Sequence, residues 1–145
     1  MMKKVILIFL AALLLLALAG CGTPINYDLP EEPMEFHTAS FVNPDDPEDG
    51  YLAIEYRGRT YVPYGTGSVG GKDVGPCLGC IVQDGEVRDG DRIFPLTADP
   101  DLNYLAELTC QGFMDQPIFY RALDTRGKDV ETPRFIQSLD YAYWD

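Results

Sequence analysis

Hydrophobic and polar residues alternate in several short runs of this chain, and this pattern predicts a mainly β domain. Residues 51–57 place every second side chain, largely apolar, on one face of a strand. A second run at 60–64 follows the turn Arg57-Gly58-Arg59, which is typical of a β-hairpin. Pro63 cannot donate a ladder hydrogen bond, so we expect the second strand to end there or to lie at a sheet edge.

Further β-rich runs follow along the chain. Residues 78–83 and 87–96 are separated by Asp84-Gly85, a tight-turn dipeptide, and residues 117–123 and 135–144 give two more strand candidates. Short strands at hairpin spacing, with at most one short helix, predict a small antiparallel barrel or sandwich.

The segment from Asp99 to Cys110 fits two local structures. Asp99 as an N-cap, followed by Pro100, is typical of a short helix. The alternative is a turn at 99–103 that leads into a strand from Tyr104, and we favour it because the run from Pro117 supplies a hairpin partner. One face of that strand would carry Tyr104, Ala106, Leu108 and Cys110.

The first 21 residues follow a different pattern. Lys3 and Lys4 precede fifteen uncharged apolar residues, which are too few for a comfortable membrane span and typical of a signal peptide. The run ends in Leu18-Ala19-Gly20-Cys21, which resembles the lipobox of bacterial lipoproteins. The resemblance implies cleavage before Cys21, attachment of diacylglycerol to its thiol and acylation of the new amine by a fatty acid such as palmitate.

We therefore expect three parts: a signal peptide at 1–20, a lipidated N-terminus with a Pro-rich acidic tether at 21–35, and one mainly β domain at 36–145. The tether is expected to be extended and to lift the domain away from the bilayer. The domain would face outward from the cell membrane, to which the lipid would anchor it.

The net negative charge of the chain makes anionic partners unfavourable. The chain has 11 basic and 23 acidic residues, and loss of Lys3 and Lys4 on cleavage would leave 9 and 23, a net charge of −14. Such an acidic surface repels phosphate backbones and anionic headgroups, so we do not expect nucleic acid as a partner. Membrane affinity is expected to come from the lipid.

One cluster of residues could carry out chemistry, and it consists of three cysteines, Cys77, Cys80 and Cys110. In an exported domain we expect a structural disulfide between Cys110 and either Cys77 or Cys80. The alternatives are a thiol-redox site at Cys77-Leu-Gly-Cys80 and a zinc site that His37, the only histidine, would complete. Apart from the covalent lipid we expect no cofactor.

A glycine-rich string at 65–70 has the letters of a dinucleotide-binding motif. That motif needs a helix to open at its third glycine, yet Gly71 and Pro76 follow. We therefore expect a mobile surface loop at this string.

The predicted hairpin offers a candidate ligand patch. Aromatic faces beside guanidinium groups can stack on sugar rings or bind a carboxylate, and the residues are Tyr56, Arg57, Arg59, Tyr61 and Tyr64. The alternative is that Tyr56 packs inward and the arginines pair with neighbouring acids.

The sequence gives no support for an enzyme, because no Ser or Cys is linked by a motif to His37, the one conventional base. We expect a non-enzymatic domain that binds an extracytoplasmic protein or a cell-wall glycan, with a thiol-redox or zinc-binding protein as the alternative. The chain also resembles uncharacterised lipoproteins of gut bacteria at 61–79, 113–117 and 138–144. This resemblance implies neither an activity nor functional residues.

Overall fold

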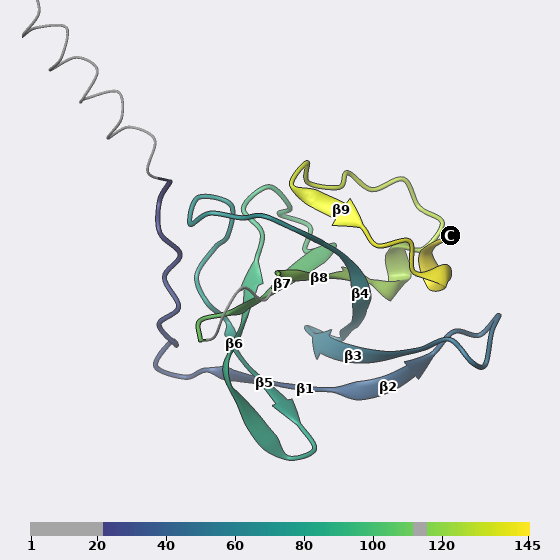
Figure 1. Ribbon diagram of the computed structural model, residues 1–145, viewed down its shortest axis with the longest axis horizontal. Coiled ribbons are helices and arrows are strands. Elements are labelled where there is room, and N and C mark those ends of the chain that lie inside the picture. Colours follow the sequence, from purple (N-terminus) through teal and green to yellow (C-terminus); the bar gives the residue numbers. More distant parts are fainter. Residues whose placement is uncertain (1–21, 112–115) are drawn as a thin grey trace, which may run out of the picture.

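A computed structural model of the chain describes residues 22–111 and 116–145 (Figure 1). The predicted signal peptide and the lipidation site Cys21 lie outside the described residues. In the described ranges, no helix has the length and apolar character needed to cross a bilayer. The strands there are β1 (Met34–His37), β2 (Ala39–Val42), β3 (Gly50–Tyr56), β4 (Arg59–Gly67), β5 (Gly79–Gln83), β6 (Glu86–Pro95), β7 (Tyr104–Thr109), β8 (Ile118–Ala122) and β9 (Ile136–Ser138), with short 3-10 helices η1 (Leu123–Thr125) and η2 (Ala142–Trp144).

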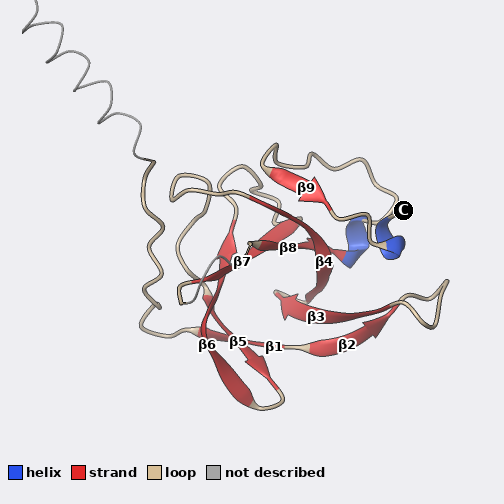
Figure 2. Ribbon diagram, viewed as in Figure 1, coloured by secondary structure: helices blue, strands red, loops and turns tan. Residues whose placement is uncertain are grey.

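The strands form one sheet that curls into a nearly closed barrel (Figure 2). Their order is β1-β5-β6-β7-β8-β4-β3-β2, and β9 adds to β4 outside this path. Only Thr38 separates β1 from β2, so the two ends of the sheet are halves of one chain segment. At this junction the Thr38 N–H donates to the Val82 carbonyl at 3.0 Å. The chain itself therefore closes the barrel and leaves little sheet edge free.

The predicted mainly β fold is confirmed, with one difference in strand direction. β1 runs parallel to β5, whereas the other strand pairs are antiparallel. The barrel wall has seven positions when β1 and β2 are counted as one. An odd number of strands cannot alternate in direction around a closed wall, so one pair has to be parallel.

The predicted hairpin is present as β3 and β4. Arg57 and Gly58 both have positive φ, 51° and 75°, as the tight turn between twisted strands requires. β4 does not end at Pro63, which sits at a bulge. On one edge β4 pairs with β8, and on the other edge it pairs first with β3 and then with β9. Pro63 lies in the gap between the β3 and β9 pairings, where no backbone N–H donor is needed.

The turn and strand favoured for residues 99–110 are also confirmed, because β7 begins at Tyr104. The Asp99 carboxylate closes the turn by accepting the Tyr104 N–H at 2.7 Å and the Asn103 amide at 3.3 Å. Tyr104, Ala106 and Leu108 pack on one face as predicted. The strand predicted at 135–144 is shorter, since β9 ends at Ser138 and η2 follows.

Apolar side chains pack on both faces of the sheet. The barrel interior receives residues from β1 and β3 to β8, namely Phe36, Ile54, Tyr56, Tyr61, Ile81, Ile93, Leu105, Tyr120 and Ala122. The outer face of β6, β7 and β8 carries a second cluster, which contains Val74, Cys77, Phe94, Leu96, Tyr104, Ala106, Leu108, Phe119 and Ile136. This outer cluster needs a cover, and the N-terminal segment supplies part of it.

Part of the segment before β1, which was predicted as a tether, packs on the domain. Ile25 and Tyr27 contact the outer cluster, and the Tyr27 ring meets Phe94 edge-on at 5.8 Å. The Gly71 N–H donates to the Thr23 carbonyl at 2.7 Å. Residues 23–27, which belong to the predicted tether, therefore contact the domain, and residues 28–35 are exposed. The division into a tether at 21–35 and a domain at 36–145 stays a prediction.

Candidate functional site

The predicted tyrosine and arginine patch is not one exposed surface. Tyr56 and Tyr61 lie in the barrel interior, 6% and 0% exposed. Arg59 is held by Asp124, to whose two carboxylate oxygens it donates at 2.7 and 3.0 Å, and by the Leu102 carbonyl at 2.8 Å. The structure thus matches the alternative for Tyr56, which packs inward, and for Arg59, which pairs with an acid, whereas the inward packing of Tyr61 was not part of that alternative.

The remaining members of the patch have separate environments. Arg57 is exposed and lies 5.1 Å from the Tyr56 ring centroid. Tyr64 contacts a different guanidinium, that of Arg121, which lies 5.3 Å from the Tyr64 ring, 5.8 Å from the Tyr104 ring and 4.9 Å from the Trp144 ring. This aromatic cage is filled by the protein's own cation and is not open to a ligand.

The structure has no disulfide among the three cysteines of the described residues. Cys80 in β5 faces Arg92 in β6, and Arg92 faces Leu108 in β7. Two strand spacings of about 4.8 Å separate Cys80 from Leu108, and Cys110 lies beyond it, so their Cα atoms are too far apart for a disulfide. The register therefore contradicts pairing of Cys80 with Cys110, whereas pairing of Cys77 with Cys110 stays a prediction.

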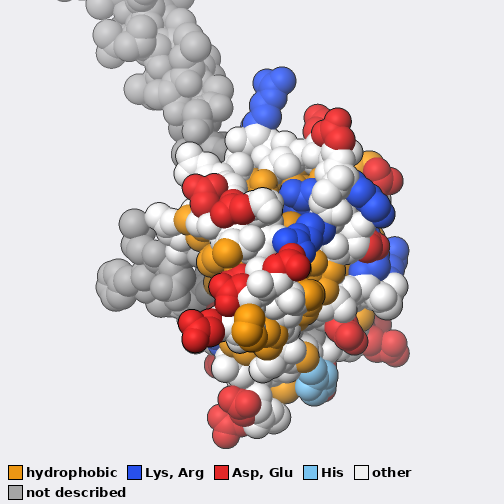
Figure 3. Space-filling model, turned by 90° about the vertical axis from the view of Figure 1, so that its right-hand side faces the viewer, with side chains coloured by type: hydrophobic (Ala, Val, Ile, Leu, Met, Phe, Trp, Pro, Cys, Tyr) orange, Lys and Arg blue, Asp and Glu red, His pale blue; other side chains and the backbone are white. Residues whose placement is uncertain are grey.

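The zinc alternative is not assembled in this structure. Among the described residues, no group of three His, Cys, Asp or Glu side chains could hold a metal ion. The His37 ring pairs with Glu35 at 3.2 Å, and its side chain is 66% exposed. In Figure 3 the single histidine is seen at the surface in pale blue. Burial raises the pKa of the Cys77 thiol more than the nearby Arg92 charge lowers it, which disfavours a reactive thiolate.

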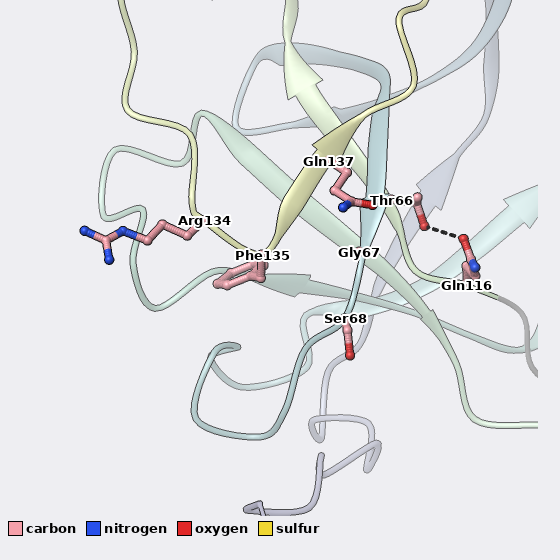
Figure 4. Close-up of a pocket in the computed structure, with 7 residues that line it drawn as sticks. All are labelled: Thr66, Gly67, Ser68, Gln116, Arg134, Phe135 and Gln137. Atoms are coloured by element: carbon pink, nitrogen blue, oxygen red, sulfur yellow. Dashed lines mark hydrogen bonds between the residues drawn. The ribbon is translucent and has the colours of Figure 1, made fainter.

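A polar cleft lies at the end of β4, between the start of β8 and the start of β9 (Figure 4). Its volume is about 440 Å³, and its walls are Thr66, Gly67, Ser68, Gln116, Arg134, Phe135 and Gln137. The Thr66 hydroxyl donates to the Pro117 carbonyl at 2.8 Å and meets the Gln116 side-chain oxygen at 3.2 Å. Figure 4 shows Arg134 extending away from the other side chains, so amides, hydroxyls and one ring make up most of the lining.

Glycines of the 65–70 string build this cleft. Gly65 and Gly67 belong to β4 and pair with Ser138 and Ile136 of β9. A Cβ atom at either glycine would overlap a backbone carbonyl, that of Gln137 or that of Phe135. The predicted mobile loop is therefore wrong for residues 65–67, which are strand. The glycines serve close packing of two strands and not a phosphate group.

A second cluster of polar side chains lies at one end of the barrel, which we call the mouth. Gln116 lines both this cluster and the cleft. A small cavity of about 180 Å³ is lined by Arg88, Glu107, Thr109, Gln116 and Ile118. Glu107 is 5% exposed, and its carboxylate accepts the Tyr120 hydroxyl at 2.7 Å. Arg88 reaches its other oxygen only at 3.8 Å, while it pairs with Asp91 at 2.8 Å.

Burial is the main influence on the pKa of the Glu107 carboxyl in the mouth. It raises this pKa, and the nearby Asp91 charge raises it further, while the Tyr120 hydrogen bond and the Arg88 charge lower it. The Tyr120 hydroxyl also has a strongly raised pKa, because it is buried next to Glu107. The mouth thus holds a carboxyl group that keeps its proton more readily than an exposed glutamate.

Neither the cleft nor the mouth was identified from sequence. The cleft residues come from three separate segments of the chain, and only long-range pairing of β4 with β8 and β9 brings them together. Glu107 lies two residues after Leu105, on the same inward face of β7. This acidic residue on an apolar strand face was the one signal in the sequence that pointed to the mouth. Comparison with protein-family models, with curated protein sequences and with solved structures finds no match.

Proposed function

We propose that this chain is a membrane-anchored lipoprotein whose β domain binds a cell-wall glycan without catalysing a reaction. The lipobox-like residues 18–21 after an apolar run support the anchor. Each buried methylene contributes about 0.8 kcal/mol, so two or more acyl chains on Cys21 would hold the protein stably. The domain would then lie on the outer side of the cell membrane.

The cleft at the end of β4 is the observation that carries the glycan assignment. Thr66, Ser68, Gln116 and Gln137 offer uncharged hydroxyl and amide groups, which match a neutral ligand rich in hydroxyls. Phe135 adds an apolar surface, against which the face of a sugar ring can pack. The chain's net charge of −12 disfavours anionic polymers as ligands.

Calorimetric titration of the full-length protein in detergent with a β-linked N-acetylhexosamine oligosaccharide tests the ligand. Wild type should bind, and Gln137→Ala should bind several-fold more weakly, because ligand hydroxyls lose a partner. Gln83→Ala is the matched control, since Gln83 lies in β5 outside the cleft. Equal affinities of wild type and Gln137→Ala, or no binding to wild type, would reject the glycan and leave a protein partner as the candidate.

The anchor has a separate test. In the native host, wild type should partition with membranes, and Cys21→Ala should lose the acyl groups and be released or stay with its leader uncut. Mass spectrometry of the N-terminus distinguishes these forms. Equal release of both proteins into the aqueous fraction would contradict lipid anchoring.

A further inference from the structure

The docked N-terminal segment fixes the place from which a lipid anchor would leave the domain. Thr23 is held by the Gly71 N–H at 2.7 Å, and the neighbouring Pro24 carbonyl lies where a Cβ at Gly71 would be. Only Gly22 separates Thr23 from Cys21. Two Cα steps of about 3.8 Å each therefore limit the distance from Thr23 to the residue that would carry the lipid.

We infer that the loop at 68–74, on which Thr23 is docked, is the face that the domain turns toward the bilayer. This inference rests on the proposed lipidation of Cys21 and adds an orientation to it. With so short a connection, the domain cannot tumble freely on its anchor, as it would on a long flexible linker. The partner of the loop is the headgroup layer of the membrane.

The distribution of charge fits this orientation. The loop carries Lys72 and one acid, Asp73, whose carboxylate is already engaged by the Gly70 N–H at 2.8 Å. Acid-rich segments lie at 43–50, in the turn between β2 and β3, and at 84–89, which covers the turn between β5 and β6 and the start of β6. Figure 1 shows both turns pointing away from the N-terminal segment. Anionic headgroups would repel those turns and attract Lys72.

The orientation also has a consequence for the cleft. Ser68 belongs to the loop and at the same time lines the cleft at the end of β4. A bound glycan would therefore be held close to the membrane surface and not at the outer tip of the protein.

Two native lysines allow the orientation to be measured. After Cys21 the only lysines are Lys72 and Lys128. The Lys128 N–H donates to the Thr125 carbonyl at the end of η1, and Figure 2 shows the short helices on the side opposite the N-terminal segment. The lipidated protein in phospholipid vesicles is labelled with a membrane-impermeant amine reagent, and each lysine is normalised to its labelling in denaturant. We expect Lys72 to react several-fold more slowly than Lys128.

Two variants uncouple the domain from its anchor in different ways: one undocks the N-terminal segment, and the other lengthens the connection to Cys21. Gly71→Ala places a Cβ against the Pro24 carbonyl, whereas the matched control Gly70→Ala meets its nearest atoms only at 3.7 Å. Ten Gly and Ser residues inserted between Gly22 and Thr23 leave the domain unchanged and add a flexible span of about 17 Å. Gly71→Ala and the insertion should bring both lysines to equal labelling, and Gly70→Ala should keep Lys72 protected.

Vesicle flotation of the same samples separates two kinds of failure. Protein that floats while Lys72 and Lys128 react equally in wild type contradicts the orientation and leaves the anchor intact. Protection of Lys72 that survives the inserted spacer also contradicts it, because the docked segment would then not be its cause. Protein that does not float contradicts the lipidation of Cys21, and the orientation with it.

Discussion

Arg121 joins three segments that are distant in the sequence. Its guanidinium contacts the rings of Tyr64, Tyr104 and Trp144, and its Nε donates to the Thr125 hydroxyl at 2.9 Å. Arg121→Met keeps most of the apolar volume and removes the charge and the donors, so the free energy of unfolding should fall by about 2 kcal/mol. Urea unfolding followed by fluorescence of Trp144, the single tryptophan, measures the change directly at this site.

Arg57→Met provides the control for a guanidinium that contacts one ring only. Because Arg57 is exposed, its replacement should change the free energy of unfolding by no more than about 0.5 kcal/mol. If both variants unfold at the urea midpoint of wild type, the cage around Arg121 contributes nothing to stability.

Glu107 and Asp124 should respond to pH in opposite directions. Burial raises the pKa of Glu107, so its favourable contribution is complete below its unfolded pKa and is lost as pH rises through the folded value. The hydrogen bond from Arg59 lowers the pKa of Asp124. That contribution is present above the unfolded pKa of Asp124 and is lost as pH falls through the folded value.

Replacing each carboxyl by its amide removes one titration at a time. Relative to wild type, Glu107→Gln should gain stability as pH rises from about 4 to 7. Asp124→Asn should lose stability at lower pH, as pH rises from about 2 to 5, because the pKa of Asp124 is lowered from an unfolded value of about 3.9. Urea unfolding of the three proteins at several pH values gives the two difference curves. Curves of the same slope would show that the environments of these carboxyls differ less than the structure indicates.

At the scale of elements, β9 depends on glycines in the strand it joins. Gly67→Ala would set a Cβ against the Phe135 carbonyl, so β9 should detach from β4, and stability should fall by about 1–3 kcal/mol. Hydrogen exchange should accelerate at the amides of β9 more than at those of β6. Gly70→Ala, three residues on, serves as the control and should exchange like wild type, whereas unchanged β9 exchange in Gly67→Ala would contradict the contact.

This element also shows why the glycine string misleads when it is read locally. The letters at 65–70 match a nucleotide motif, yet the glycines are required by backbones from elsewhere in the chain: β9 at Gly65 and Gly67, and the N-terminal segment at Gly71. A close approach of this kind leaves no periodic signal in the sequence. The hairpins did leave one, because alternation and turn residues are local, and so β3 with β4 and the turn before β7 were predictable.

For the whole molecule, local patterns predicted a small barrel or sandwich of short strands, but not the closure of the barrel or its site. Alternation specifies strands, and strands at hairpin spacing specify antiparallel neighbours, which accounts for most of the wall. The parallel pairing of β1 with β5 joins segments about 45 residues apart without any turn signal. The cleft and the docking of residues 23–27 depend on the same kind of long-range contact. Lipidation of Cys21 rests on the sequence alone and stays a prediction.

Closure of the barrel depends on Gly79, because β1 passes too close to this position for any side chain. Gly79→Ala would set a Cβ against the Met34 carbonyl and separate β1 from β5. Since β2 continues directly from β1, the disturbance should reach the β2–β3 pair, and the free energy of unfolding should fall by about 1–3 kcal/mol. Hydrogen exchange should accelerate at the amides of both β1 and β2.

Gly50→Ala, whose Cβ would lie 3.9 Å from the Phe41 carbonyl, is the control in the same sheet. Faster exchange in β1 alone would show that the two halves of the segment open independently and that the barrel does not unfold as one unit.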